Sequence, residues 1–324
     1  MKKVVIIGGG TGTFTLLKGL KKYPLKLSVI VSSADDGGST GRLRREWGVF
    51  PPGDIRQCLV GLSAANPRVL EAFSYRFSQG KLAGHVAGNI LIAALEKIIG
   101  GITPAIEILS KWLKVSGEVI PATVRPTTLV AKFENGRVVI GEHNIDEPKK
   151  NPRSRIKKLV LRPASRANPR ALAAVASADA IVFGPGDLYT SILPSLLPGG
   201  LTGAINKSPA KKIMVTNIMT KPGQTDGFTA ADFVSELKKY LGAKIDVAAL
   251  NSQRPDSRSV KQYRRASAEP VLADANKLAS FGVKVVSKPI ISKLKIKKSA
   301  GDILQRSLVR HDSQKLAKII WELV

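Results

Sequence analysis

The chain has 324 residues, 44% of them hydrophobic, and it carries 51 Lys and Arg against 24 Asp and Glu, a net charge of +27. That apolar content is enough for a large packed core, so a disordered chain is excluded. The sequence has no run of 18 apolar residues that could cross a membrane, and its single cysteine, Cys58, excludes an internal disulfide and a cysteine-rich zinc site.

The N-terminal segment is the most informative part of the sequence. Two lysines lead straight into a buried-strand pattern, Val4 to Ile7, without a signal-peptide core, so we expect a cytoplasmic protein with no transmembrane segment. A glycine-rich turn, Gly8 to Thr13, and an amphipathic helix follow. Because such a turn brings backbone N–H groups and a helix N-terminus close to an anion, it predicts a phosphate cradle; a purely structural turn is the alternative. The spacing is neither Walker A nor a strict GxGxxG, since Thr13 stands at the third glycine position.

Strand-like runs alternate with helical patterns along the rest of the chain. They lie at residues 3–8, 27–33, 158–162, 179–184, 211–217, 245–250 and 283–287, and several are continuous Val and Ile. Continuous apolar strands separated by helices predict an α/β fold with a mostly parallel sheet covered on both faces.

A helical pattern at about 54–113 and a β-hairpin interrupt this alternation. The hairpin strands, Leu129–Phe133 and Arg137–Ile140, flank an Asn-Gly turn signal. We expect a single domain over residues 1–324 with a helical and hairpin insertion at about 54–150. The basic, proline-containing stretch 146–155 is the one candidate boundary. Cys58 lies in the helical pattern and is interpreted as a core residue.

Polar and glycine-rich loops follow four of the predicted strands. Because the carboxyl ends of parallel strands line one crevice, we expect these loops to form a single ligand site. His85, in the segment 84–89, is either a ligand contact or a buried, satisfied histidine. The candidate ligand-binding residues from the loops and this segment are Gly9, Gly10, Thr11, Gly12, Thr13, Asp35, Asp36, Arg42, Asn89, Gly184, Gly186, Asp187, Ser191, Asn217 and Thr220.

The adjacent acids Asp35 and Asp36 have two interpretations. They stand about 25 residues beyond the glycine turn, near the place where a Rossmann domain carries its ribose-binding acid. Alternatively, Asp36 and Asp54 hold Mg²⁺ on a diphosphate, because this ion takes oxygen ligands and keeps phosphate as a partner. Asp54 also follows Pro-Pro-Gly and is a good N-cap for a helix starting at Ile55. No cofactor is assigned firmly; Mg²⁺ is the one considered.

Much of the positive charge lies in two segments, 149–170 and 254–298. A charge field of this kind attracts polyanions, but a solvated basic surface accounts for it equally well. Aromatic residues are only 5% and do not alternate with the basic runs, so a nucleic-acid partner is not expected. The sequence has no GxSxG motif and offers little for a thiol–imidazole nucleophile, which disfavours covalent hydrolases.

Several long motifs, in order, resemble those of the YvcK-type gluconeogenesis factors, which are related to the CofD-type 2-phospho-L-lactate transferases. The resemblance runs from Val4 to the C-terminal helix. Its motifs are GGGTG at 8–12, ADDGGSTGRLR at 34–44, PPGDIRQCLVGL at 51–62, GHVAGN at 84–89, GPGDLYTSILPSLL at 184–197, NIMTKPGQTDGFTAADFV at 217–234 and RHD at 310–312.

This resemblance implies a cytosolic, Rossmann-like three-layer sandwich that binds a UDP-sugar, typically UDP-N-acetylglucosamine, or another dinucleotide-like diphosphate. It implies a role in cell shape and wall synthesis during growth on gluconeogenic carbon, with cell-wall synthesis proteins as partners and a homo-oligomer as one form. Tyr263 and Arg310 are implied as the uridine-side and phosphate-side contacts. Three residues depart from the pattern: Asp187 replaces a small serine, and Lys221 and Gln224 stand where Gln and Glu are commoner.

Two functions remain open at this stage. The first is a ligand-sensing regulator without obligatory catalysis, and no catalytic residue is assigned to it. The second is a transferase of phosphorus-containing groups, in which Asp36 and Asp54 hold Mg²⁺ while an acceptor hydroxyl attacks the phosphate. The motifs resemble the morphogenesis branch more closely, which favours the regulator.

Overall fold

The computed structural model describes residues 1–148, 154–293 and 308–324. Its centre is a seven-stranded parallel sheet in the order β10-β9-β8-β7-β1-β2-β3. The strands are β1 (Lys2–Ile7), β2 (Leu25–Val31), β3 (Glu118–Pro121), β7 (Ala180–Phe183), β8 (Lys211–Val215), β9 (Val247–Asn251) and β10 (Lys284–Lys288). The predicted α/β fold with a mostly parallel sheet is confirmed.

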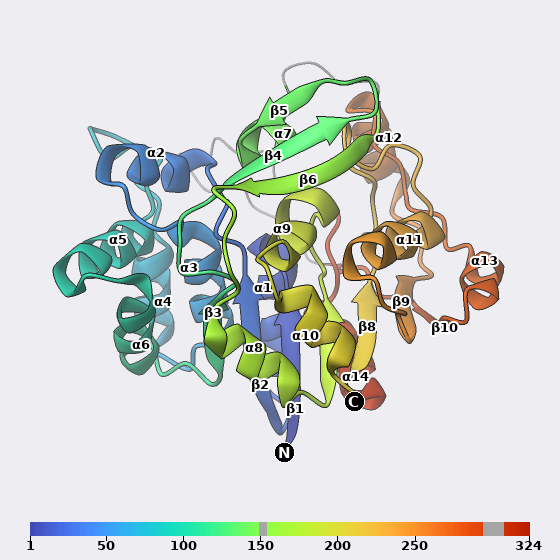
Figure 1. Cartoon of the computed structure of the whole chain (residues 1–324), viewed down its shortest axis with the longest axis horizontal. Helices are drawn as coiled ribbons and strands as arrows, with labels where there is room; N and C mark the ends of the chain where they lie inside the picture. The colour runs from blue at the N-terminus through green and yellow to red at the C-terminus, as the bar shows by residue number, and fades with distance from the viewer. Residues whose placement is uncertain (149–153, 294–307) are drawn as a thin grey trace.

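Helices cover both faces of this sheet and make it the middle of three layers (Figure 1). One face packs against α1 (Gly10–Leu20), α3 (Pro52–Leu62), α5 (Ala87–Ile99), α6 (Ile102–Trp112) and α14 (Ser313–Leu323); the other packs against α8 (Pro169–Ala176), α9 (Leu193–Leu196), α10 (Leu201–Lys207) and α11 (Ala230–Leu241). The remaining helices are α2 (Gly38–Trp47), α4 (Pro67–Ser74), α7 (Glu142–Asp146), α12 (Ser257–Arg265), α13 (Ala275–Ser280) and the π-helical turn η1 (Leu188–Ile192).

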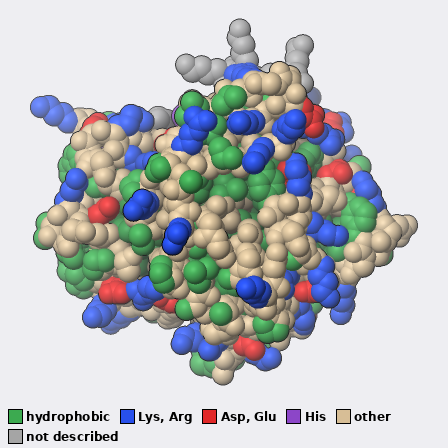
Figure 2. Space-filling view, viewed as in Figure 1, with side chains coloured by type: hydrophobic (Ala, Val, Ile, Leu, Met, Phe, Trp, Pro, Cys, Tyr) green, Lys and Arg blue, Asp and Glu red, His purple; other side chains and the backbone are tan. Residues whose placement is uncertain are grey.

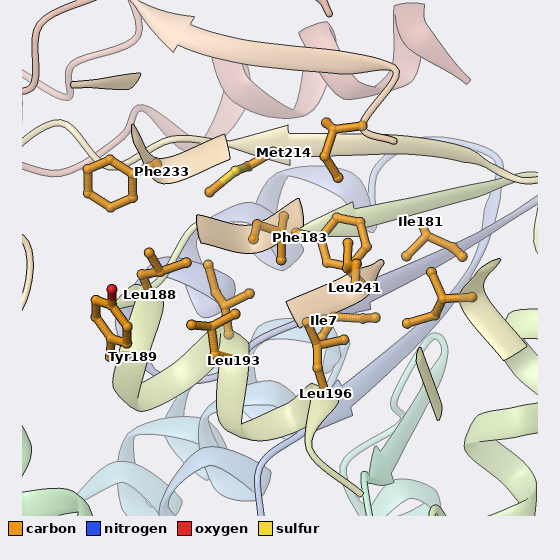
Figure 3. Close-up of a cluster of buried hydrophobic side chains, with 14 of the residues drawn as sticks. Ile7, Ile181, Phe183, Leu188, Tyr189, Leu193, Leu196, Met214, Phe233 and Leu241 are labelled. Atoms are coloured by element: carbon orange, nitrogen blue, oxygen red, sulfur yellow. The ribbon is translucent and has the colours of Figure 1, made fainter. Parts of the chain in front are cut away.

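The alternation of apolar residues along β1 explains the three layers. Val5 and Ile7 belong to the core cluster on the α8–α11 side, whereas Val4 and Ile6 belong to the cluster on the α1 and α14 side. Figure 3 shows part of the first cluster, in which Ile7 lies among side chains from β7, β8 and the η1–α9 segment. Both sides of the strand are therefore buried, which is why the sequence of β1 is continuously apolar.

A second, three-stranded antiparallel sheet lies beyond the upper ends of the parallel strands in Figure 1. Its order is β5-β4-β6, from β4 (Thr128–Phe133), β5 (Val138–Ile140) and β6 (Ile156–Arg162). The predicted hairpin is confirmed. The prediction that residues 158–162 form a strand of the parallel sheet is wrong: β6 pairs antiparallel with β4, and β3, from within the expected insertion, joins the parallel sheet at its edge.

One further prediction is confirmed, and two others fall partly outside the described residues. Cys58 is fully buried in α3, as expected of a core residue. The candidate boundary 146–155 and the basic segments 149–170 and 254–298 each include residues outside the described ranges. On the face shown in Figure 2, Lys and Arg side chains are spread among uncharged ones rather than gathered in one stripe.

Among the described residues, no helix is long and apolar enough to span a bilayer.

Candidate functional site

A crevice of about 760 Å³ lies at the carboxyl edge of the parallel sheet. It is lined by residues from the loops after β1, β2, β7 and β8, from α7 beneath the small sheet, and from the segment before α14. The predicted ligand residues that line it are Gly9, Gly10, Thr11, Gly12, Asp35, Asn89, Gly186, Asp187, Ser191, Asn217, Thr220, Tyr263 and Arg310. The four predicted loops therefore meet at one place, as the parallel topology requires.

Four predicted residues are not among those that line the crevice. Thr13 is buried, and its hydroxyl donates to the Pro185 carbonyl at 3.2 Å. Asp36 turns toward α7, where its Oδ1 accepts the N–H of His143 at 2.7 Å. Arg42 donates to the carbonyl of Ala83 at 2.7 Å. The N–H of Gly184 bonds the carbonyl of Ile7 and continues the sheet. Each of these polar groups is used to hold the loops in place.

The glycine turn holds an internal carboxylate. The N–H of Gly10, the first residue of α1, donates to Asp54 Oδ1 at 2.8 Å. A Cβ on Gly9 would lie 1.9 Å from Asp54 Oδ2, so only glycine lets the carboxylate approach this closely. The prediction that Asp54 caps its own helix is wrong, because α3 starts at Pro52 and Asp54 lies inside its first turn. At the N-terminus of α1, the N–H of Gly10 is thus bonded to a carboxyl group of the chain itself, and the phosphate cradle stays a prediction.

Three partly buried carboxyl groups in the crevice resist ionisation. Burial, and then the charge of Asp35, raise the pKa of Asp54 to about 7. Burial also raises the pKa of Asp35, although an N–H from Gly37 partly offsets the effect. The pKa of Glu142, on α7, is raised well above its usual range by burial and then by Asp146. These carboxyl groups are stabilised by a bound proton or a nearby cation, so a phosphate can lie beside them only when their charge is neutralised in one of these ways.

The expected Mg²⁺ ligands, Asp36 and Asp54, do not fit one ion in this geometry. Asp36 is engaged with α7 and Asp54 with the glycine turn. The carboxyl group whose charge acts most on Asp54 is instead that of Asp35. Asp35 also packs against Gly53, the residue before Asp54: a Cβ on Gly53 would lie 2.6 Å from Asp35 Oδ2. Across the described ranges, no three His, Cys, Asp or Glu side chains are grouped as metal ligands.

A half-buried lysine connects three segments around the crevice. Lys221 Nζ, in the loop after β8, lies 2.8 Å from Asp146 Oδ1 and 2.9 Å from Asp187 Oδ2. Burial alone would lower the pKa of Lys221, but the charges of Asp187 and Asp146 raise it overall. Thr190 also donates to Asp146 at 2.8 Å. Asp187 and Lys221, two of the residues that depart from the family pattern, are therefore partners. The ammonium, which Asp187 shares with Asp146, offsets part of the negative charge that would repel a phosphate.

Arg56 is a crevice residue that sequence reasoning did not select. Its Nε donates to Asn89 Oδ1 at 2.8 Å, and Asn89 donates in turn to Ser39 Oγ at 3.2 Å. Ser39 also shares a 3.2 Å hydrogen bond with His85. His85 is buried and does not belong to the lining, so the interpretation as a satisfied histidine is the correct one. The PPGDIR motif contained the signal for Arg56, which follows Asp54 by two residues.

Tyr263 and Arg310 line another part of the crevice, together with His311, which was not selected from the sequence. The Tyr263 hydroxyl accepts the N–H groups of Leu308, at 2.9 Å, and Val309, at 3.3 Å. Its ring packs against an apolar cluster formed by Ile218, Met219, Ile291 and Val309. The tyrosine thus fixes the segment that carries Arg310 and His311.

Comparison with known proteins places the chain among well-defined relatives. The family model of the 2-phospho-L-lactate transferase CofD matches residues 4–291. A putative gluconeogenesis factor of Thermotoga maritima is 42% identical over 319 residues, which cover 98% of each chain. The gluconeogenesis factor of Bacillus subtilis is 40% identical over 325 residues, which cover 99% of this chain and 98% of that protein.

A solved structure agrees with these matches over the full length. The crystal structure of a member of the UPF0052 family from Bacillus halodurans superposes with a TM-score of 0.90 at 38% identity, covering 99% of both chains.

Proposed function

The chain belongs to the CofD family, and we propose that it is a regulatory protein that binds a nucleotide sugar, with UDP-N-acetylglucosamine as the ligand. In this role it supports growth on gluconeogenic carbon and maintenance of cell shape, through protein partners in cell-wall synthesis. The names of its relatives as gluconeogenesis factors support the metabolic part of the proposal.

The observation that carries the proposal is the continuity of the crevice. It reaches from the N-terminus of α1, where backbone N–H groups favour an anion, to a wall formed by Tyr263 and the apolar cluster. Arg56 and Arg310 also line it, and guanidinium groups can bond two oxygens of a diphosphate at once. A volume of about 760 Å³ lies in the usual range for small-molecule sites.

A transferase of phosphorus-containing groups is the second candidate. The family match to a 2-phospho-L-lactate transferase favours it, and so do the buried carboxyl groups of Asp35 and Asp54 beside the glycine turn. In such an enzyme the acids would serve the reacting phosphate, by taking a proton from an acceptor hydroxyl or by holding a cation that neutralises developing charge.

Titration calorimetry with UDP-N-acetylglucosamine, with and without Mg²⁺, tests the proposal, and phosphorus NMR of the same samples reports turnover. We expect binding, a raised melting temperature and an unchanged ligand. Failure of this nucleotide sugar to bind would overturn the proposal. Consumption that requires Mg²⁺ and is lost in both Asp35→Asn and Asp54→Asn would establish the transferase instead.

A further inference from the structure

Two buried polar atoms in the crevice lack a partner. Among the described residues, the buried side-chain atoms without a hydrogen bond are Ser165 Oγ, Asn217 Oδ1, Gln224 Oε1, His311 Nε2 and Ser313 Oγ. Of these residues, Asn217 and His311 line the crevice, at the end formed by Tyr263. A buried polar atom left unbonded costs about 1–3 kcal/mol, so native proteins rarely keep one without a use. These two atoms therefore indicate where a ligand supplies hydrogen bonds.

The imidazole of His311 is held as a hydrogen-bond acceptor. Burial lowers its pKa to about 4, so the ring is neutral near pH 7. The ring also bonds the backbone of Thr216, and because Nε2 has no partner in the described part of the chain, that bond is made by Nδ1. A neutral imidazole that donates from one nitrogen presents a lone pair on the other. Nε2 is therefore a buried acceptor that requires a donor.

Asn217 supplies a second acceptor beside the first. It follows Thr216 directly, just beyond the end of β8, and its Oδ1 is buried without a bond among the described residues. The same loop and the Val309 segment give the surrounding walls, because Ile218, Met219 and Val309 line the crevice next to the Tyr263 ring. Apolar walls with hydrogen-bonding groups at one edge are the environment in which proteins read a nucleobase.

We propose that His311 selects the nucleobase of the bound nucleotide by accepting a hydrogen bond from a ring N–H. The Asn217 oxygen is a second acceptor, for which the exocyclic amino group of guanine supplies a donor and the edge of uracil does not. The inference rests on the proposed nucleotide binding and adds the class of base. Uracil N3 and guanine N1 carry a hydrogen, whereas cytosine N3 and adenine N1 are acceptors and would face the Nε2 lone pair. A site built around such a bond discriminates strongly against ligands that lack the donor.

Calorimetry with five nucleotides tests the inference on the unmodified protein. UDP, GDP, CDP, N3-methyl-UDP and 2′-deoxy-UDP are titrated under one set of conditions. We expect UDP or GDP to bind at least about 100-fold more tightly than CDP. N3-methylation should abolish the binding of UDP, while removal of the 2′-hydroxyl changes its affinity by only a few-fold. The comparison of UDP with GDP identifies the base.

The outcomes separate this inference from the proposed function. If UDP-N-acetylglucosamine and all five nucleotides fail to bind, both are overturned. If N3-methyl-UDP binds as well as UDP, the crevice is a nucleotide site but His311 does not read the base, and only the inference is wrong. Loss of binding in 2′-deoxy-UDP alone would mean that the imidazole contacts the ribose, which also contradicts it.

Two variants assign the selectivity to the imidazole. His311→Phe removes the acceptor and should lower UDP affinity about 10- to 100-fold while CDP affinity stays constant, so that the preference disappears. His311→Gln offers an amide oxygen and should keep part of the preference. Ser165→Ala, which removes another unbonded buried atom outside the crevice, is the matched control and should change neither affinity. Equal losses for UDP and CDP in His311→Phe would show a merely structural residue and overturn the inference.

Discussion

Asp54→Asn is the substitution that probes the glycine turn most directly. Asn has the shape of Asp and keeps an oxygen that can accept the N–H of Gly10, now 2.8 Å from Asp54 Oδ1. What the substitution removes is a negative charge in a partly buried place beside Asp35. The experiment therefore isolates the electrostatic cost of Asp54 from its structural contact.

The expected magnitude follows from the pKa of the folded state. The pKa of Asp54 rises from 3.8 to about 7 on folding. The proton it binds therefore stabilises the fold fully below about pH 4, and this contribution is lost as the pH rises through 7. The shift corresponds to at most about 4 kcal/mol. Because solvent reaches part of the carboxylate, we expect Asp54→Asn to be about 1–3 kcal/mol more stable than the native protein at pH 8.

Urea unfolding at pH 4 and pH 8 measures this difference in the free energy of unfolding. The gain from Asp54→Asn should be present at pH 8 and absent at pH 4. Asp256→Asn is the control, because the hydrogen bonds from Ser259 lower the pKa of Asp256 and its effect on stability should change with pH in the opposite direction. A loss of stability in Asp54→Asn that is equal at both pH values would refute the reasoning, since a lost contact, not a relieved charge, would then dominate.

Three further substitutions test other parts of the crevice. Gly12→Ala places a Cβ 2.5 Å from the Pro185 carbonyl oxygen and should abolish UDP-N-acetylglucosamine binding in calorimetry, whereas Gly203→Ala, which meets no atom within 4 Å, should bind normally. Lys221→Met leaves Asp146 and Asp187 without their cation and should cost about 2–4 kcal/mol in urea unfolding, part of which Asp187→Asn in the same chain should restore. Tyr263→Phe keeps the ring but loses the hydrogen bonds from the N–H groups of Leu308 and Val309. It should lower the free energy of unfolding by about 1–3 kcal/mol, measured as a lower urea midpoint. An unchanged midpoint would mean that the hydroxyl does not fix this segment.

The errors in the predicted sheet have physical causes. Apart from an irregularity in the pairing near Ile156, β6 buries apolar side chains, Leu159 and Leu161 among them, and exposes basic ones, which is the pattern of a sheet with one solvated face. Its Val and Leu content made it look like a strand of the parallel sheet. β3 was missed because it has only four residues and ends at Pro121 on the sheet edge, where the sequence signal is weakest.

The position of the site could be predicted from the sequence, whereas its internal contacts could not. Parallel topology alone brings the loops after β1, β2, β7 and β8 to one edge. The ion pair of Lys221 with Asp146 joins residues 75 positions apart, and Asp146 comes from α7 beneath the small sheet, in a region where only a hairpin was predicted. Asp54 was predicted as a helix cap because a local role can be read from neighbouring residues, while its actual bond to Gly10 spans 44 positions.

The two ends of the crevice make opposite demands on a ligand. At the glycine turn, Asp54 takes a backbone N–H that a phosphate would otherwise accept, so a diphosphate gains this position only by displacing or neutralising the carboxylate. At the other end, His311 and Asn217 present acceptors and require donors. Arg56 and Arg310 line the same crevice and offer a negatively charged group an attractive position away from Asp54. A nucleotide can place a base N–H against His311 while its diphosphate lies against these guanidinium groups, whereas a simple phosphate offers the guanidinium groups a partner but brings no base to His311.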